Sequence, residues 1–425
     1  MKILQFGSTD VMGSRFNGQD LHKQFAKRGI DSQHIVWDKK GSDLNTVEIT
    51  HSRFLCKLNA LANKIQSALS LQSILNPSIF PLLVNRTFLN SDIVHYHLIH
   101  TGYFSLANFP LLTRMKPAVW TLHDPWAMTG HCVHPFDCQR WKTGCGSCPN
   151  LKAEFAMKRD NTALMWKLKK IFYANSKIDL IVASKWMLDM VNSSPLMSNF
   201  KVHHIPFGLD LNVFKSGPSA EKKKKLGIPP ENVVISVRST MSEYKGLEYI
   251  IKAIEILKTS VPITILTFNE RGHFNQFLGK HQIIELGWVE DEEETIDAYQ
   301  ARDIFVMHSV AEAFGMMAME AMACEKPVIT FDGTSLSEVI FAPEGGISVP
   351  ARDIDALVSA MCDLIENPEK RIKIGIRARE LAVQHYDINQ QIKRTLEVYQ
   401  EVLSRRSLKD RIQVSNNALY PEGKK

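Results

Sequence analysis

Two carboxylates stand alone in a long apolar segment of the sequence. Glu312 and Glu320 are eight positions apart in AEAFGMMAMEAMAC, and they are the only charged residues between Ala311 and Cys324. A carboxylate buried in such a segment costs several kcal/mol unless another group pairs with it or donates hydrogen bonds to it. The pattern therefore predicts either a ligand site or a core helix whose two acids pair with Arg or Lys.

A strand gives way to a helix near Gly315. The carboxyl end of a parallel strand is where open α/β sheets bind ligands. There the N–H groups of the first helical turn and the helix dipole favour an anion. Glu320, one turn further on, can accept hydrogen bonds from ribose hydroxyls, whereas Glu312 reaches the group beyond the phosphates. The N–H groups expected to face the ligand belong to Phe314, Gly315, Met316 and Met317.

Two basic residues supply the positive charge that a diphosphate needs. Arg238 ends the predicted strand VVISVRS, and Lys245 precedes Gly246, where the next helix opens. Arg offers a planar fork of donors, and Lys offers a mobile point charge. Such a pair by itself is often only a surface feature. Together with the two glutamates it predicts a nucleoside-diphosphate site.

Several histidines follow two neighbouring strands of the first half. HYHLIH contains His95, His97 and His100, and the next strand ends in TLHD at His123. A histidine at a strand end is usually structural, and we expect this for His95 and His100. His97 shares a side of its strand with His95 and is expected on the acceptor side of the site. His123 ends a buried strand at the ligand-binding edge.

Four of the seven cysteines fall within one loop, HCVHPFDCQRWKTGCGSCP, and only the last pair has the CxxC spacing of a zinc knuckle. Four thiolates would complete the tetrahedral coordination of a structural zinc ion, and the metal would stabilise a loop that has little hydrophobic core of its own. Free thiols and one or two disulfides are the alternatives. The four residues are Cys132, Cys138, Cys145 and Cys148.

Ile- and Val-rich strands alternate with helical segments along the chain, which is typical of parallel sheets built from βαβ units. Six strand candidates lie on each side of residue 212, so the 425 residues predict an α/β chain of two Rossmann-like, doubly wound domains. We expect domains over 1–208 and 209–386, a helix over 387–406 that braces the first domain, and a polar tail over 407–425. Asn17 is expected to cap a helix ending at Gly29. Residues 208–232, which contain Gly, Pro, Ser and a Lys run, are expected to be a linker plus a solvated surface segment.

Residues 49–91 break this alternation and contain no Asp or Glu. Helical spacing places apolar side chains from Phe54 to Leu69 on one stripe, with Arg53, Lys57 and Lys64 on an adjacent face. A basic amphipathic helix of this kind can lie at the surface of an anionic bilayer. The alternative is a helix that packs its apolar stripe against the domain and leaves its basic face in solvent.

Composition excludes several other classes. A formal charge of +6 over 425 residues is too weak to indicate nucleic-acid binding. The N-terminus lacks the apolar core of a signal peptide, and no run approaches the roughly 18 apolar residues of a membrane-spanning helix. Without an export signal, the cysteines read as thiols or metal ligands. These features predict a cytoplasmic protein.

Taken together, the motifs resemble the retaining glycosyltransferases of family 4, which have the GT-B fold. The resemblance covers roughly residues 1–400 and rests mainly on EAFGMMAME, RSTMSEYKG, VHHIPFGLDLNVF and GWVEDEEETIDAYQARDIFVMHS. DIVHYHLIHTGYF, VWTLHDPWAMTGHC and ASKWMLDMVNSSPLM resemble the subgroup that builds polysaccharides and lipopolysaccharides.

The resemblance implies that a nucleoside-diphosphate sugar of UDP or GDP type binds the second domain, that the acceptor binds the first, and that chemistry occurs in a cleft. Arg238 and Lys245 would hold the diphosphate and neutralise the leaving group, so that catalysis requires no cofactor and no catalytic metal. Glu320 would bind the ribose, and Glu312 the hydroxyls of the donor sugar.

The remaining site residues follow from the same resemblance. The base would lie against Trp288 and Val289, and His123 would touch the donor sugar near its reacting carbon. The usual pair of glycines near the start is replaced by VMGSRFNG, which leaves Gly13 as the candidate for an acceptor or phosphate loop. The strand before Glu312, which commonly ends in Pro-Ser, ends here in His308-Ser309.

We therefore expect a retaining hexosyltransferase that extends a lipid-linked or surface glycan in polysaccharide or lipopolysaccharide biosynthesis. It would be peripheral on the cytoplasmic face of the membrane if the basic helix binds lipid. A nucleotide-sugar epimerase of the same fold and a catalytically inactive glycan- or membrane-binding scaffold are the alternatives. The intact set of acids and cations argues against the scaffold.

Overall fold

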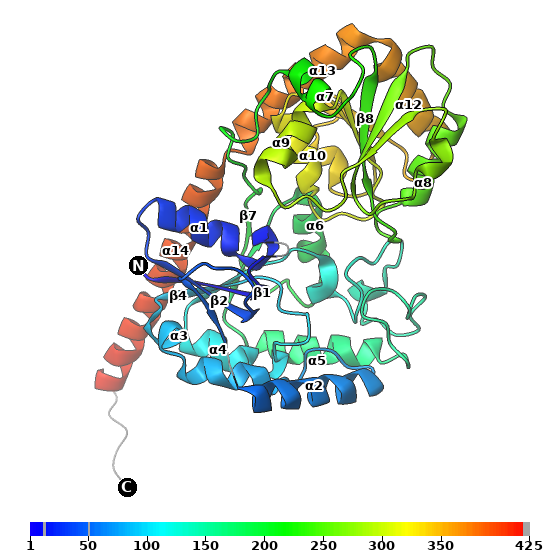
Figure 1. The fold of residues 1–425 in the computed structure, drawn as a ribbon. Helices are drawn as coiled ribbons and strands as arrows, with labels where there is room; N and C mark the ends of the chain where they lie inside the picture. Colours follow the sequence, from blue (N-terminus) through cyan, green and yellow to red (C-terminus); the bar gives the residue numbers. More distant parts are fainter. Residues whose placement is uncertain (12–13, 50–51, 420–425) are drawn as a thin grey trace. The chain divides into compact units, whose positions relative to one another are not determined.

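The computed structural model describes residues 1–11, 14–49 and 52–419. They form two compact units, each with one parallel sheet (Figure 1). The first unit contains residues 1–183, 187–205 and the chain from Ile392 onward, and the second contains 184–186 and 206–391. The chain enters the second unit at Pro206 and returns to the first within helix α14 (Ile388–Leu419).

The first sheet has the strand order β3-β2-β1-β4-β5-β6-β7. Six of these strands were predicted. β3 is additional, and its three residues carry no apolar run that could have indicated it. The strands are β1 (Ile3–Thr9), β2 (Ser32–Asp38), β3 (Thr46–Glu48), β4 (Ile93–Tyr96), β5 (Ala118–Thr121), β6 (Asp179–Val182) and β7 (Val202–His204).

The two faces of this sheet differ in polarity. On one face, Tyr96 and Trp120 pack edge to face against Phe109 of α4, with ring centroids 5.3 and 5.4 Å apart. On the other face, Gln5 and His95 are register partners on neighbouring strands, and both are buried. Because side chains alternate along a strand, the second face carries a buried polar row that needs hydrogen-bond partners from the helices above it.

The helices of the first unit are α1 (Gln19–Lys27), α2 (Arg53–Ala68), α3 (Arg86–Asn90), α4 (Phe109–Met115), α5 (Thr162–Ala174) and α6 (Lys185–Ser193), whose first two residues belong to the second unit. Short 3-10 helices are η1 (Ser14–Asn17), η2 (Pro77–Val84), η3 (Leu106–Asn108), η4 (Pro125–Met128) and η5 (Arg140–Lys142).

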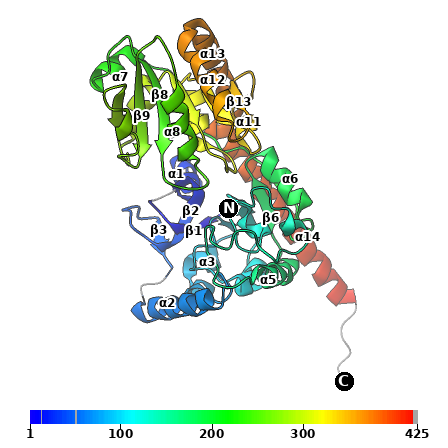
Figure 2. The same cartoon turned by 90° about the vertical axis from the view of Figure 1, so that its right-hand side faces the viewer.

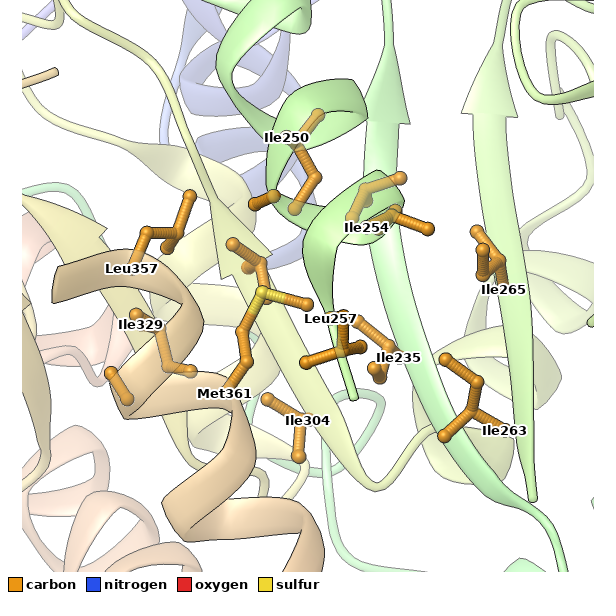
Figure 3. Packing of buried hydrophobic residues seen from close by; sticks show 14 of the residues in the cluster. Ile235, Ile250, Ile254, Leu257, Ile263, Ile265, Ile304, Ile329, Leu357 and Met361 are labelled. Atoms are coloured by element: carbon orange, nitrogen blue, oxygen red, sulfur yellow. The ribbon is translucent and has the colours of Figure 1, made fainter. Parts of the chain in front are cut away.

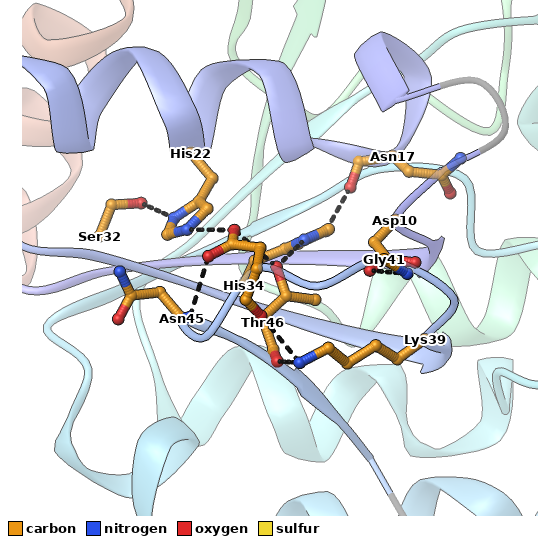
Figure 4. Close-up of polar contacts among 10 residues, drawn as sticks. Asp10, Asn17, His22, Ser32, His34, Lys39, Gly41, Asn45 and Thr46 are labelled. Carbon is orange, nitrogen blue, oxygen red and sulfur yellow. Dashed lines mark hydrogen bonds and ion pairs between the residues drawn. The ribbon is translucent and has the colours of Figure 1, made fainter. Parts of the chain in front are cut away.

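The prediction that Asn17 caps α1 is wrong, because Gly18, with φ 85°, occupies the N-cap position. The Asn17 side chain instead accepts hydrogen bonds from the backbone N–H and the hydroxyl of Ser8, at 2.9 and 2.7 Å. Its backbone oxygen lies 2.9 Å from Nε2 of His34, within a polar cluster that also includes His22 and Thr46 (Figure 4). Asn17 therefore ties the end of β1 to β2.

The second sheet has the order β10-β9-β8-β11-β12-β13, and all six of its strands were predicted. Its core lies between the sheet and helices α8 and α12, where Ile235, Ile304 and Ile329 meet Ile254 and Met361 (Figure 3). The strands are β8 (Val233–Ser239), β9 (Ile263–Asn269), β10 (Gln282–Glu285), β11 (Ile304–Met307), β12 (Val328–Phe331) and β13 (Gly346–Val349). Two doubly wound α/β units are therefore confirmed.

The helices of the second unit are α7 (Ser219–Lys225), α8 (Leu247–Ile256), α9 (Glu292–Ala301), α10 (Met316–Ala323), α11 (Leu336–Val339), α12 (Ile354–Glu366) and α13 (Pro368–His385), with a 3-10 turn, η6 (Asn275–Phe277). The expected linker contains a helix, and its Lys run is only partly solvated, with Lys224 and Lys225 exposed and Lys223 buried. The run lies in α7, where Lys222 and Lys225 each approach Asp297 of α9 to 2.5 Å and Lys223 pairs with Asp303 at 2.7 Å.

The last helix is longer than predicted. α14 continues to Leu419, so the expected polar tail from residue 407 is helical in its described part. No Gly or Pro interrupts the chain before Pro421, and polar residues such as Lys, Arg and Gln are good helix formers. Among the described helices, none combines the length and the apolar character needed to cross a membrane.

Candidate functional site

Three predicted site residues lie together where the strand order of the second sheet reverses, between β8 and β11. Arg238 is half-buried at the end of β8, and its Nε donates to the hydroxyl of Thr240 at 3.2 Å. Nζ of Lys245 lies 2.5 Å from Oε1 of Glu312, and these side chains are 20% and 15% exposed. At this reversal the loops that follow β8 and β11 lead away from the sheet in opposite directions. The gap between two such loops, at the carboxyl edge of the strands, is where doubly wound sheets bind ligands.

His308, which replaces the usual proline, holds the two cationic segments in place. Its Nδ1 lies 2.7 Å from the backbone oxygen of Lys245, and its Nε2 lies 3.1 Å from that of Arg238. Burial lowers the pKa of His308 to about 4, so the ring is neutral at pH 7 and has one N–H. The shorter distance assigns that proton to Nδ1. From the end of β11, the ring therefore donates its one hydrogen bond to the Lys245 segment, and its second nitrogen lies against the Arg238 segment.

The loop that carries Lys245 is closed by further backbone contacts. The backbone N–H groups of Val310 and Ala311 both donate to the oxygen of Tyr244, at 3.0 and 3.1 Å. Gly246 has φ 62°, and a Cβ there would lie 2.4 Å from the oxygen of His308. Only glycine fits a left-handed position at so close an approach. The Lys245–Glu312 contact is thus built into the loop geometry.

Glu320 has the polar partner that its burial requires. Oη of Tyr299, on α9, donates to Oε2 of Glu320 at 2.5 Å. Burial, reinforced by Glu320, holds the pKa of Tyr299 well above its usual value. Arg302 places its guanidinium 3.7 Å above the Tyr299 ring. Glu312 pairs with Lys245, as the alternative of two acids paired with Arg or Lys expected, and Glu320 interacts both with Tyr299 and electrostatically with Arg302. Tyr299 was missed, although the sequence places it in DAYQARD directly before β11.

The loop between Glu312 and α10 is held by its carbonyl groups. The hydroxyl of Ser335 lies 3.1 Å from the backbone oxygens of Glu312 and Phe314, and that of Ser184 donates to Ala313 at 2.7 Å. Phe314 anchors the loop through ring contacts with Phe207 and Tyr386. These carbonyl groups are therefore already hydrogen-bonded. The first N–H groups of α10 have no acceptor within the helix, and they form the remaining polar surface of this turn.

The other donor-side residues lie around this turn. Gly315 is the N-cap of α10 with φ 107°, and Met316 and Met317 are half-buried in its first turn. Val289 and Met317 pack against one small core cluster. Trp288 is 58% exposed and offers an aromatic face on which a base could stack.

Two predicted histidines of the first unit are directly joined. Nδ1 of His97 lies 3.2 Å from Nε2 of His123, and Nε2 of His97 lies 2.7 Å from Oε1 of Gln5. Since the Gln5 oxygen can only accept, Nε2 of His97 carries its proton, and Nδ1 accepts from Nε2–H of His123. Burial lowers the pKa of His123 to about 3 and that of His97 well below its usual value. Both rings are therefore neutral, with fixed tautomers.

The same chain of hydrogen bonds continues to the last helix. Nε2 of Gln5 donates to Oη of Tyr399 at 3.2 Å, and Oη lies 2.6 Å from Nδ1 of His95. Nε2 of His95 lies 2.6 Å from the hydroxyl of Thr121. The buried polar face of the sheet is thus satisfied by one side chain of α14. Tyr399 was not predicted, because its partners lie more than 300 positions away in the sequence.

His100 pairs with Asp124 at 3.2 Å and stacks on Trp126. His95 is enclosed in the chain of hydrogen bonds described above. These contacts agree with the structural role that we expect of both histidines. Gly13 lies outside the described residues.

The four clustered cysteines, Cys132, Cys138, Cys145 and Cys148, line one cavity and are all free thiols. Burial raises the pKa of Cys132 to about 11 and that of Cys145 to about 12. Nζ of Lys169 is buried beneath this loop and donates to the backbone oxygens of Trp126 and Thr129. Among the described residues, no group of three or more His, Cys, Asp or Glu has the arrangement of a metal site. Structural zinc stays a prediction.

Comparison with known proteins identifies the second unit. Residues 218–381 match the family described as glycosyl transferases group 1. The colanic acid biosynthesis glycosyl transferase WcaC of Escherichia coli is 24% identical over 377 residues, which cover 84% of this chain and 89% of WcaC. The chain spans only about half the length of other curated relatives that it matches. One of them, a D-inositol 3-phosphate glycosyltransferase of Corynebacterium glutamicum, is 27% identical, and 46% of its length is covered.

Solved structures of low sequence identity share the fold. HepE of Anabaena, in complex with UDP, aligns with a TM-score of 0.65 at 16% identity, over 94% of this chain and all of HepE. WaaG, a glycosyltransferase involved in lipopolysaccharide biosynthesis, aligns with a TM-score of 0.62 at 13% identity, over 93% of this chain and 98% of WaaG. The family resemblance and the GT-B fold are confirmed: the chain is a glycosyltransferase of GT-B fold whose second unit carries the group 1 glycosyl transferase domain.

Proposed function

We propose that this glycosyltransferase is a retaining hexosyltransferase with a nucleoside-diphosphate sugar as donor. The observation that carries the proposal is the cluster of Arg238, Lys245 and Glu312 at the reversal of strand order. Cations at this edge can hold a diphosphate, and a carboxylate beside them can accept hydrogen bonds from sugar hydroxyls. HepE was solved with UDP-glucose, and one relative is named a GDP-mannose-dependent mannosyltransferase, which supports a donor of UDP or GDP type.

In the proposed net reaction, the oxygen of an acceptor hydroxyl forms a bond to the anomeric carbon of the donor sugar, whose configuration is retained, and the hydroxyl proton is released to solvent. The bond from that carbon to the phosphate oxygen breaks, and its electron pair leaves with the nucleoside diphosphate. Arg238 and Lys245 neutralise this developing charge. When the donor binds, before this step, Lys245 exchanges Glu312 for a phosphate oxygen, which leaves Glu312 to accept hydrogen bonds from the donor sugar.

The acceptor in this proposal is a lipid-linked or surface glycan in polysaccharide or lipopolysaccharide biosynthesis. The support is WcaC, which is named for colanic acid biosynthesis and is matched along most of its length. The acceptor-side role of His97 and the donor-sugar contact of His123 stay predictions.

Glu320 gives the sharpest test of the donor site. Glu320→Ala removes the carboxylate proposed to bind ribose and should weaken the affinity for nucleoside diphosphate by about 10- to 100-fold, because hydrogen bonds to charged groups contribute roughly 1.5–3 kcal/mol. Tyr299→Phe removes its protein partner but keeps the carboxylate, and should change the affinity much less. Glu231→Ala, at the opposite edge of the sheet before β8, is the matched control. Equal affinity of Glu320→Ala and wild type would refute the ribose assignment.

Two further measurements complete the test. A thermal-shift screen against UDP, GDP and ADP sugars should select one base, since a ligand at 100 times its Kd stabilises the protein by about 2.7 kcal/mol. NMR of the first product should show the anomeric configuration of the donor. An inverted product would overturn retention while leaving the donor site intact, and free sugar nucleotide formed without acceptor would favour an epimerase.

A further inference from the structure

A fully buried arginine lies behind the donor-side carboxylate Glu320. Arg302 directly follows α9, and none of its surface is exposed. Helices α9 and α10 cover the face of the second sheet that lies opposite α8 and α12 (Figures 1 and 2). Within this layer, Arg302 interacts electrostatically with Glu320 of α10. The arginine is thus a charged group inside the packing that supports the candidate donor site.

The guanidinium of Arg302 has few polar contacts. Its Nε donates to the backbone oxygen of Ala298 at a long 3.4 Å, and its two terminal nitrogens meet no acceptor in hydrogen-bond geometry within the described part of the chain. Aromatic rings surround it instead. Its central carbon lies 3.7 Å from the ring centroid of Tyr299, 4.8 Å from that of Phe305 and 5.1 Å from that of Phe268. Burying a charge with so few hydrogen bonds is costly, so stability alone does not explain an arginine at this position.

The charges around Arg302 indicate Glu320 as its counter-ion. Burial raises the pKa of Cys324 to about 12 and holds the pKa of Tyr299 well above its usual value, so both groups are neutral at pH 7. Lys326, which also interacts with Arg302, adds no negative charge. Of these four groups, Glu320 is therefore the one that carries a negative charge at pH 7.

Tyr299 connects the arginine to the carboxylate. The guanidinium lies over one face of its ring, and its Oη donates to Oε2 of Glu320 at 2.5 Å. The ring also contacts Phe214 and Phe268, with centroids 5.9 and 6.1 Å apart. Such packing locks the ring, and a locked ring directs its hydroxyl at the carboxylate from a fixed position.

The cation that α13 contributes near α10 is engaged differently. Arg379 donates to the backbone oxygens of Phe214 and Ala323, each at 2.7 Å, and to that of Leu211 at 3.2 Å. Three carbonyl groups therefore hold this guanidinium near the C-terminal end of α10. Arg302 differs, because its partners are an aromatic ring and a carboxylate.

We propose that Arg302 is a positioning residue of the donor site, which keeps Glu320 ionised and oriented toward the ribose of a nucleoside diphosphate. The inference rests on the ribose assignment of Glu320 in the proposed function. An opposite charge favours the ionised form of a carboxylate, whereas burial favours the neutral form. Without the guanidinium, the half-buried Glu320 would bind a proton more readily, and a neutral acid accepts hydrogen bonds more weakly than a carboxylate. The alternative is a structural role for Arg302 as the cation at the C-terminal end of α9.

Arg302→Met tests the proposal, because it removes the charge and keeps a long side chain in the same packing. The dissociation constants for UDP and GDP are measured with the full-length protein and divided by those of wild type at pH 7.5 and 5.5, so that protonation of the ligand cancels. The ratio should be about 3–10 at pH 7.5 and should rise by a further two- to fivefold at pH 5.5, because a carboxylate that loses an opposite charge binds a proton more tightly. The Tm should be unchanged or higher, since replacing a buried charge by an apolar side chain of similar volume is often neutral or stabilising.

Three further variants make the result specific. Arg302→Gln, which is also neutral, should give the same rise at pH 5.5 and replaces Arg302→Met if that variant does not fold. In a Glu320→Gln background, Arg302→Met should change the dissociation constant by less than twofold, because the amide carries no charge for the guanidinium to stabilise. Arg371→Met is the matched control. Arg371 is half-buried in the same unit and donates to the backbone oxygens of Leu364 and Ile365 at 2.7 and 3.1 Å, and its substitution should leave the ratio at 1.

The outcomes separate this role from the ribose assignment. A lower Tm of Arg302→Met with wild-type dissociation constants at both pH values would show a structural role and overturn the proposal. Equal effects of Arg302→Met in the wild-type and Glu320→Gln backgrounds would also overturn it. If Glu320→Ala weakens binding and neither neutral Arg302 variant does, the ribose assignment stands and Arg302 has no positioning role. If Glu320→Ala binds like wild type, both fail.

Discussion

The hydroxyl of Tyr399 offers a direct test of how the last helix supports the first sheet. Tyr399 is fully buried, and its oxygen accepts from Gln5 and lies within hydrogen-bond distance of Nδ1 of His95, at 3.2 and 2.6 Å. The neutral His95 ring has one N–H, and it pairs with Tyr399 through Nδ1 and with Thr121 through Nε2. Tyr399→Phe removes both bonds with little change in shape.

The expected loss of stability follows from the two groups left behind. Gln5 and His95 are both buried, so neither can take water in place of the lost partner. A buried polar group without a partner costs about 1–3 kcal/mol, so the two together should lower the free energy of unfolding by roughly 2–6 kcal/mol. For a unit of this size, a loss of about 3 kcal/mol corresponds to a decrease in Tm of roughly 6–12 °C.

Tyr173→Phe is the matched control. Tyr173 is equally buried in the same unit, but its hydroxyl has no hydrogen-bond partner within the described part of the chain. Its removal should therefore leave the free energy of unfolding within about 0.5 kcal/mol of wild type. Equal effects of the two substitutions would refute the reasoning, because only one of them breaks the hydrogen-bond chain.

Urea unfolding followed by tryptophan fluorescence suits this comparison. Five of the seven tryptophans belong to the first unit, so the signal reports mainly on the part of the chain that contains Tyr399. The midpoint should fall for Tyr399→Phe at an unchanged slope, which would show a loss of stability and not a change of the unfolding reaction.

Two further predictions concern pH and metal. Burial keeps four histidines neutral, with pKa values lowered to about 3 or 4; they are His34, His95, His123 and His308. Below pH 6.5 the unfolded chain binds protons at these histidines and the folded chain does not. As the pH is lowered from 6.5 to about 4, the free energy of unfolding therefore decreases, by roughly 1.4 kcal/mol per histidine at pH 5.5. An unfolding midpoint equal at pH 7.5 and 5.5 would contradict this. Elemental analysis should find one zinc per chain if the four-cysteine loop binds metal, and zinc-free protein with four titratable thiols there would exclude it.

Most of the fold could be predicted from the sequence, because strands buried on both faces are continuous apolar runs. VVISVRS and DIFVMHS show this for β8 and β11. The three residues of β3 carry no such signal. The Lys run was misread because a charge run is usually solvated, whereas Asp297 and Asp303, more than 70 positions away, pair with it.

The donor-side residues could be predicted because strand topology already brings them together. Arg238 lies at the end of β8 and Glu312 follows β11, and parallel strands end at one edge of a sheet. Tyr299 and Tyr399 could not be predicted, since a hydrogen bond to one atom depends on helix rotation and register to within an ångström. Periodicity does not encode that information.

Helix α2 shows a different limit of sequence reasoning. Its stripe was identified from spacing, but spacing does not say whether a stripe faces the core. Burying one large apolar side chain contributes about 1.5–3 kcal/mol, so leaving Phe54, Leu61 and Ile65 outside forgoes roughly 5–9 kcal/mol. The amides of Asn59, Asn63 and Gln66 take the buried side instead, where hydrogen bonds contribute less net stability than apolar burial would. Leu55, Leu58 and Ala62 of the same stripe are half-buried, so the helix packs along one edge of its apolar side. The rotation of α2 is set by hydrogen bonds from Asn59 and Asn63 to Gly102, which lies 43 and 39 positions away, and the spacing of apolar residues does not encode such contacts.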